Sequence, residues 1–143
     1  MTMALDNIFG IAGTALNAQL TRMNATASNL ANAGTMAGSE KEAFRAKRAV
    51  FKALLDEQQT HAGAPYVGGV KISHIADDGS PPVKVADPKN PLADKDGYVY
   101  KSNVSEVTEM VEMMAAARSY QNNVEVINTA RQLMMRTLDV TKA

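Results

Sequence analysis

The sequence predicts a mainly α-helical fold with a small β-rich insertion, in which long N- and C-terminal amphipathic helices pack as a coiled-coil-like pair. Two observations lead to this prediction. Near both ends, apolar residues recur every three or four positions, which is the spacing of a narrow helical stripe. The middle of the chain instead alternates apolar and polar residues between clusters of Gly, Pro, Asn and Asp, a pattern typical of short strands and turns.

The first helix is predicted from about Asp6 to Asn32, within an N-terminal rod-like segment of residues 1–35. Asp6 is suited to cap its start, and Asn32-Ala33-Gly34 offers a left-handed stop at its end. The apolar stripe consists of Phe9, Ala12, Leu16, Leu20, Met23, Ala27 and Leu30. Outside the stripe the surface is mostly Asn, Thr, Ser, Gln and Ala, whereas solvated helices usually carry many Lys and Glu residues. This helix is therefore expected to pack against neighbours on several sides.

Residues 36–65 are predicted to form a connecting basic arm, which from Ser39 is either a short helix or an extended segment. Its basic residues are Lys41, Arg45, Lys47, Arg48 and Lys52. They lack the interleaved aromatic residues that stack on bases, so a solvated face is favoured over a nucleic-acid patch, and an ionic role towards another subunit is left open.

Residues 66–102 are predicted to form the β-rich insertion. Val70–Ile72 and Val83–Val85 alternate as strands and flank a strong turn signal at Asp77–Pro82. Further turn signals precede a third short strand at Tyr98–Tyr100. So few strands are not expected to be very stable alone.

The second long helix is predicted from Asn103 to about Val140, within a C-terminal rod-like segment of residues 103–143. Asn103 and Glu106 have the spacing of a capping box. The apolar stripe consists of Val107, Met110, Val111, Met114, Ala117, Tyr120, Val124, Ile127, Ala130, Met134 and Leu138. Its methionines fit two interpretations equally, as fillers of a core or as an interface that adapts to non-identical neighbours.

Composition limits the functions that are open to this chain. The 15 basic and 15 acidic side chains balance, so no overall charge draws the protein to nucleic acid or to anionic lipid. The absence of cysteine excludes disulfides and thiolate metal sites. No signal peptide and no window of about 20 apolar residues is visible, so a membrane-spanning segment is not expected. Aromatic residues are only 5% of the chain, and much of the apolar content is alanine, which buries little area.

No catalytic, cofactor or metal site is expected. The two histidines, His61 and His74, have no partner at ligand spacing, and the common nucleophile and phosphate-loop motifs are absent. Asp94-x-Asp96-Gly97 resembles the start of a calcium loop, but Val99 and Ser105 occupy the positions that need Gly and Glu. The acidic pairs at Asp77/Asp78 and Asp94/Asp96 fit turns better than a hydrolytic cleft.

Several short motifs resemble those of the flagellar rod and hook proteins. The run Asn29-Leu-Ala-Asn-Ala-Gly-Thr35 matches the motif that ends their first helix. Asp96-Gly-Tyr-Val, Glu109-Met-Val and Arg118-Ser-Tyr-Gln-x-Asn123 follow in the order and spacing of their C-terminal segment. The run Asp87–Asp94 is similar to one typical of a proximal rod subtype, with Asn90 in place of its usual His. The resemblance covers essentially the whole chain.

The resemblance implies a structural subunit that is exported by the flagellar type III apparatus without a cleaved signal peptide. It implies location in the periplasmic rod of the basal body, where terminal helices of many subunits pack into a helical tubular assembly that transmits torque. The implied partners are the protein itself and other flagellar rod proteins, in homo- and hetero-oligomers, together with the basal-body adaptor and the MS-ring and export-gate components.

The narrow stripes leave apolar surface uncovered in a lone chain, and such surface marks interfaces. The terminal helices are therefore expected to be weakly ordered until assembly. The residues expected at the subunit interface are Leu16, Leu20, Met23, Asn29, Leu30, Asn32, Val107, Met110, Met114, Tyr120, Val124, Ile127 and Met134. Asn29 and Asn32 also fit a simpler role as local helix caps. An alternative function is a cytoplasmic two-helix adaptor or export chaperone.

Overall fold

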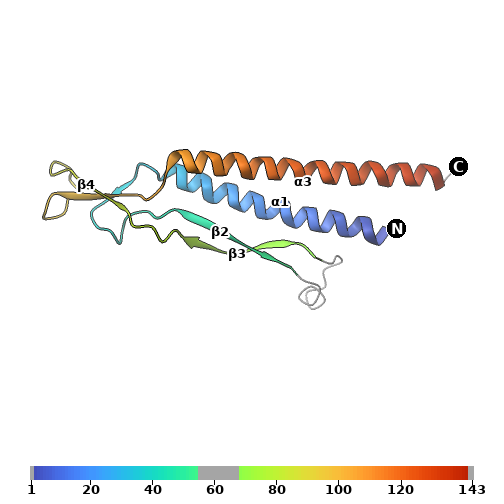
Figure 1. Cartoon of the computed structure of the whole chain (residues 1–143), viewed down its shortest axis with the longest axis horizontal. Coiled ribbons are helices and arrows are strands. Elements are labelled where there is room, and N and C mark those ends of the chain that lie inside the picture. Colours follow the sequence, from blue (N-terminus) through green and yellow to red (C-terminus); the bar gives the residue numbers. More distant parts are fainter. Residues whose placement is uncertain (1, 55–67, 142–143) are drawn as a thin grey trace. The chain divides into compact units, whose positions relative to one another are not determined.

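The computed structural model describes residues 2–54 and 68–141, and within them two long helices flank a β-rich segment (Figure 1). The mainly α-helical fold with a small β insertion is thereby confirmed. The elements in chain order are α1 (Thr2–Ala31), β1 (Met36–Ala37), β2 (Lys47–Ala53), β3 (Val70–Asp77), β4 (Val83–Ala86), β5 (Tyr98–Lys101) and α3 (Glu106–Thr141). The last part of the predicted basic arm, residues 55–65, lies outside the described residues, as does His61.

The chain divides into two compact units, and the division crosses both helices. The first unit comprises the described residues of Met1–Thr21, Val50–Ser73 and Ala115–Ala143. The second comprises Arg22–Ala49 and His74–Met114. Each unit therefore takes one stretch of α1 and one stretch of α3, together with part of the β-rich segment.

The second unit contains a three-stranded antiparallel sheet in the order β1-β5-β4. Met36 pairs with Lys101 at one edge, and Val83 pairs with Lys101 at the other. Val99 of the central strand is fully buried, as expected for the middle of a sheet. The turn before β5 is held by Asp94, whose Oδ1 atom accepts hydrogen bonds from the Asp96 and Tyr98 N–H groups.

The strands that flank Asp77–Pro82 do not pair with each other. β3 pairs with β2 in a separate two-stranded sheet, whereas β4 pairs with β5. The predicted turn is therefore a connection between two sheets, and within it Ser80 N–H donates to Asp78 Oδ1. In the connecting arm, the extended alternative is the one observed, because β2 occupies Lys47–Ala53.

The first helix differs from the prediction at both ends. It begins at Thr2, so Asp6 lies inside it rather than at its cap. It ends at Ala31, close to the predicted end, but Gly34 is not left-handed, since the positive-φ residues in the described part of the chain are Gly68, Gly69 and Gly97. A tight turn replaces the left-handed stop, with Ala33 N–H bonded to Leu30 O.

The second helix begins at Glu106, and its cap is Ser105 rather than Asn103. Ser105 Oγ accepts the Thr108 N–H at 3.4 Å, and Glu109 N–H bonds to Ser105 O. The predicted capping box is wrong because the Asn103 side chain serves a tertiary contact instead. Its Oδ1 atom accepts the Ala46 N–H at 2.7 Å, and its Nδ2 atom donates to Ser80 O.

Candidate subunit interface

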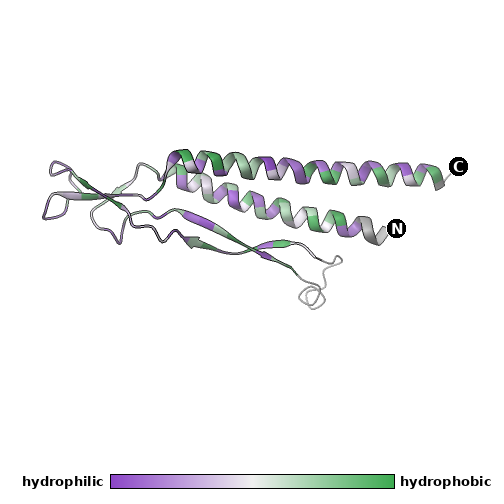
Figure 2. Ribbon diagram, in the orientation of Figure 1, coloured by the Kyte–Doolittle hydropathy of each residue, from purple (hydrophilic) through white to green (hydrophobic). Residues whose placement is uncertain are grey.

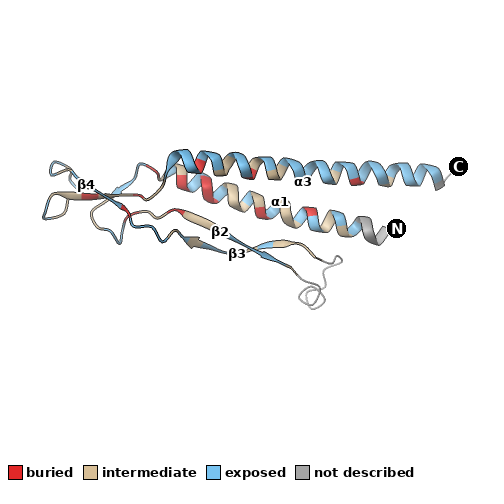
Figure 3. Cartoon of the chain, viewed as in Figure 1, coloured by how far each residue is buried: buried red, intermediate tan, exposed pale blue. Residues whose placement is uncertain are grey.

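The outward-facing side of α3 in the second unit is apolar. Val107, Met110, Val111 and Met114 are spaced three or four residues apart, and we call this row the outer face. Val107 is 74% exposed and Met114 is 65% exposed. Figures 2 and 3 show the hydrophobic positions of α3 and how much of the helix is open to solvent. Exposed rows of large apolar side chains are typical of surfaces that another protein covers.

The inward-facing side of the same helix carries the opposite chemistry. Glu109 and Ala116 are fully buried, and Glu112 lies half-buried between them. The chain therefore buries a carboxylate and small side chains while it exposes valines and methionines. This distribution is the reverse of the one that would stabilise an isolated helix pair.

In the first unit, α3 also presents apolar side chains to solvent. The exposed apolar residues of this stretch include Val126, Leu133, Met135, Leu138 and Val140. Of the predicted interface residues in this stretch, Tyr120, Ile127 and Met134 are half-buried, and Val124 is 36% exposed.

A shallow groove of about 460 Å³ lies in this first unit between α1 and α3. Ile8 of α1 lines one side, and Val126, Ala130 and Leu133 of α3 line the other. The lining is mostly apolar, so the groove extends the exposed apolar surface of this unit.

The buried apolar residues in the described part of α1 are alanines, and one of them, Ala12, belongs to the predicted stripe. Ala12, Ala18 and Ala25 are buried, because a methyl side chain allows a neighbouring element to approach closely. The larger predicted interface residues are less covered: Leu20 is exposed, and the half-buried ones are Leu16, Met23 and Leu30.

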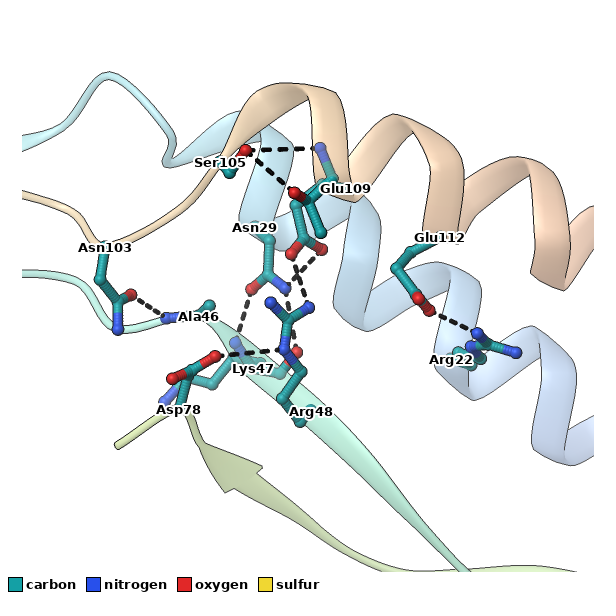
Figure 4. A network of polar contacts seen from close by, with 11 residues as sticks. Arg22, Asn29, Ala46, Lys47, Arg48, Asp78, Asn103, Ser105, Glu109 and Glu112 are labelled. Atoms are coloured by element: carbon teal, nitrogen blue, oxygen red, sulfur yellow. Dashed lines mark hydrogen bonds and ion pairs between the residues drawn. The ribbon is translucent and has the colours of Figure 1, made fainter. Parts of the chain in front are cut away.

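Asn29 lies where α1, β2 and α3 of the second unit meet (Figure 4). Its Nδ2 atom donates to Glu109 Oε2 and to Lys47 O, each at 2.9 Å. Its Oδ1 atom accepts the Lys47 N–H at 2.7 Å. The side chain is fully buried and all three groups are used within the chain. Asn29 therefore contributes to the fold of its own subunit, and its expected contact with another subunit stays a prediction.

Arg48 supplies the second donor to Glu109. Its Nη1 atom lies 2.5 Å from Glu109 Oε1, and its Nε atom lies 3.5 Å from Asp78 Oδ2. We call Asn29, Lys47, Arg48, Asp78 and Glu109 the Glu109 cluster. Because its carboxylate is 0% exposed, Glu109 depends on these donors in place of water.

The cluster also affects two pKa values. Partial burial would lower the pKa of Arg48, but the hydrogen bond and charge of Glu109, aided by Asp78, raise it above its ordinary value. The pKa of Asp78 is lowered, first by hydrogen bonds from Ser80 and then by the charge of Arg48. Both groups therefore stay ionised over the whole neutral range.

Further ion pairs surround the cluster. Arg22 of α1 pairs with Glu112 of α3, one helical turn beyond Glu109. Lys47 pairs with Asp77 at 2.5 Å, and Arg45 lies 3.7 Å from Glu40. The predicted basic face is therefore largely neutralised by acidic residues of its own chain.

The sequence did not single out Glu109 or Arg48 as partners. Glu109 was named only as part of the Glu109-Met-Val motif, and Arg48 as one of five basic residues of the predicted arm. A signal for Glu109 exists in the helical spacing, since Glu109, Glu112 and Ala116 form a polar and small row beside the apolar one. The Asn32 side chain bonds within its own helix end, since its Nδ2 atom donates to Ser28 O in the last turn of α1.

Within residues 2–54 and 68–141, no group of three or more His, Asp or Glu side chains is arranged to hold a metal ion. None of the helices in these segments is both long enough and apolar enough to cross a membrane.

Comparison with known proteins gives matches at both ends and along the whole chain. The family described as "Flagella basal body rod protein" matches residues 9–36, and "Flagellar basal body rod FlgEFG protein C-terminal" matches residues 95–140. Asn29 lies in the first matched segment and Glu109 in the second, so their hydrogen bond joins the two.

Full-length relatives carry one shared name. The flagellar basal-body rod protein FlgC of Escherichia coli O6:H1 is 48% identical over 136 residues, which cover 95% of this chain and 97% of the relative. FlgC of Salmonella typhimurium gives the same identity and coverage. FlgC of Buchnera aphidicola subsp. Acyrthosiphon pisum is 45% identical over 142 residues, covering 98% of this chain and all of the relative.

Proposed function

This chain belongs to the FlgC family of flagellar basal-body rod proteins, and from that premise we propose that it polymerises as a subunit of the proximal rod. As a member of this family it is a structural protein and not an enzyme. The proposal extends to export by the flagellar type III apparatus without a cleaved signal peptide, and to a periplasmic position in a tube that transmits torque.

The observation that carries the proposal is the reversed chemistry of α3. Its outer face exposes Val107, Met110, Val111 and Met114, while Glu109 on the opposite side is fully buried. A structural subunit that must be covered by its neighbours needs this arrangement, since apolar area hidden on assembly supplies most of the association free energy. Repeated contacts between different surfaces of identical subunits generate an open helical array when the rotation between subunits does not close into a ring.

The remaining expected interface residues fit the same role. Leu20 and Val124 are exposed, and Leu16, Met23, Leu30, Asn32, Tyr120, Ile127 and Met134 keep part of their surface open. We propose that neighbouring rod subunits cover these residues, and that the terminal helices gain much of their order on assembly. The basal-body adaptor and the MS-ring and export-gate components are the proposed contacts beyond the rod.

The alternative of a cytoplasmic adaptor or export chaperone is not favoured, since the named relatives are basal-body rod proteins. Protease added to spheroplasts separates the two. A rod subunit outside the inner membrane is exposed to the protease and is digested unless the assembled basal body covers it. A cytoplasmic adaptor is shielded by the inner membrane and is recovered intact when the spheroplasts are lysed.

The interface is tested by Met114→Asp in cells whose only copy of the protein carries the change. A charge buried among apolar neighbours is costly, so we expect export to continue while incorporation into basal bodies and swimming are lost. Val124→Asp is expected to act in the same way. Gln121→Asp, which changes an exposed polar residue of the same helix, is the matched control and should leave motility intact. Normal motility with Met114→Asp would overturn the proposed interface.

A further inference from the structure

The Glu109 cluster and the outer face lie on the same short stretch of α3. Successive residues of an α-helix are about 100° apart, so the outer face is centred about 150° around the axis from Glu109. Burial of apolar side chains alone would favour turning the helix until Met110 and Met114 pack against α1 and β2. In the structure they are exposed, and the carboxylate occupies the inward position.

We propose that Glu109, with Asn29 and Arg48, forms a set of positioning residues for assembly, which holds α3 at the rotation that presents its outer face to neighbouring subunits. This inference rests on the proposed function, because it assigns to the cluster the control of the surface through which the rod assembles. It gives the cluster a role in specificity rather than in stability.

The geometry supports this role because the donors come from different elements. Asn29 lies on α1 and Arg48 on β2, and each bonds to a different oxygen of the Glu109 carboxylate. Asn29 is itself fixed by both backbone groups of Lys47, so the two donors are tied to each other. If α3 turned about its axis or slid along it, both bonds would break and a buried carboxylate would be left without donors.

Buried polar groups have this effect in other helical assemblies. A polar side chain in an apolar helix interface fixes register and orientation while it lowers stability. Replacing a buried ion pair by well-packed apolar side chains is often neutral or stabilising for the folded chain. A positioning role therefore separates two quantities that a purely structural role would move together, the stability of the free subunit and its competence to assemble.

The test is the double variant Arg48→Met/Glu109→Met in the full chain. The control is Arg22→Met/Glu112→Met, which removes an ion pair between α1 and the same stretch of α3, with a carboxylate that is 40% exposed rather than fully buried. Because the chain contains no cysteine, Met114→Cys can be added to each protein as a single maleimide-labelling site that reports exposure of the outer face.

We expect the Arg48→Met/Glu109→Met subunit to unfold at or above the parental temperature. We also expect maleimide labelling at position 114 to slow, and incorporation into basal bodies to fall roughly tenfold or more, the effect of about 1.4 kcal/mol on an equilibrium. The control pair should keep parental labelling and incorporation. Parental labelling and incorporation in the double variant would overturn the proposal.

A second variant keeps the test decisive if the double variant does not fold. Glu109→Gln preserves the shape of the side chain and the acceptor for Asn29, but it removes the charge that Arg48 contacts. We expect a folded subunit with reduced incorporation, and parental incorporation would reject the positioning role. Failure of the proposed function is recognised separately, since Met114→Asp would then incorporate normally.

Discussion

Asn29 connects three elements of the second unit through a single side chain. It accepts the Lys47 N–H, donates to the Lys47 carbonyl oxygen, and also donates to the buried Glu109 carboxylate. An amide is well suited to this position because it offers two donors and an acceptor without adding a charge to a buried site. A residue in the last turn of α1 therefore also fixes the start of β2.

Replacing this amide should be costly. Asn29→Ala leaves the Lys47 N–H and one Glu109 oxygen without partners in a buried site, so we expect the free energy of unfolding to fall by roughly 2–3 kcal/mol. Asn32→Ala is the matched control, since that amide bonds only to Ser28 O near the surface, and should cost less than about 1 kcal/mol. Urea unfolding of both variants measures the difference, and equal losses would contradict the assignment.

Asp94 gives the turn before β5 a dependence on pH. The Tyr98 N–H, with smaller contributions from the Asp96 N–H, the Lys84 charge and the Tyr100 hydroxyl, lowers the pKa of this carboxyl below its ordinary value. The folded-state pKa is therefore lower than the unfolded-state pKa of about 3.9. The stabilisation is fully present above the unfolded pKa and is lost as pH falls through the folded pKa.

The Asp94→Asn variant tests this dependence. We expect it to be less stable than the parent in urea at about pH 6, and the difference to shrink as the pH falls through the folded-state pKa, because the parental carboxyl then becomes neutral as well. Asp96→Asn removes the same charge from the same turn without altering the Asp94 carboxylate. A stability difference for Asp94→Asn that does not change with pH would contradict the assignment.

At the residue scale, sequence reasoning identified the polar positions but not their partners. Asn29 was predicted as an interface residue or a local helix cap and Asn103 as part of a capping box, yet each bonds to the backbone at the start of β2. Such contacts join residues 18 and 57 positions apart, and periodicity carries information only about neighbours within a few turns. For the same reason the pairing of Arg48 with Glu109 could not be predicted.

At the element scale, β3 is anchored to α1 in the first unit through a close backbone approach. Thr14 Oγ1 donates to Ile11 O and accepts the Val70 N–H at 3.1 Å. Gly69 precedes this contact with φ of 137°, and a Cβ atom there would lie 2.8 Å from Thr14 Oγ1. Only glycine meets both the conformational and the steric requirement at this position.

We expect Gly69→Ala to loosen this anchor, at a cost of roughly 1–3 kcal/mol from backbone strain and the steric conflict with Thr14. The Val70 amide should then lose protection from hydrogen exchange, which can be measured on the free subunit. Gly79→Ala is the control, because a Cβ at Gly79 meets nothing within 4 Å and its φ is not positive. Unchanged protection of Val70 in Gly69→Ala would contradict this account of the anchor.

The elements themselves were largely predictable, since both helices and the three short strands at Val70, Val83 and Tyr98 follow from periodicity and turn residues. The ends of these elements and the pairing of the strands were less predictable. α3 begins at Glu106 rather than at the predicted Asn103, because the Asn103 side chain makes tertiary hydrogen bonds and does not cap the helix. The assignment of β3 and β4 to different sheets depends on long-range pairing, which local patterns do not encode.

For the whole molecule, the central feature is the placement of its apolar surface. Large apolar side chains such as Val107, Met114 and Val140 are exposed, while the buried positions are dominated by alanine and polar residues. Stability of a lone subunit is therefore limited by a small core. Membership of a rod-protein family is consistent with this exposed apolar surface, because neighbouring subunits of a polymer can cover it.

The most direct test of this account is maleimide labelling of a Met114→Cys subunit, free in solution and in isolated basal bodies, normalised to the same protein unfolded in urea. We expect rapid labelling of the free subunit and strong protection in the basal body. Protection already present in the free monomer, or equal labelling in both states, would contradict the claim that neighbouring subunits cover the outer face of α3.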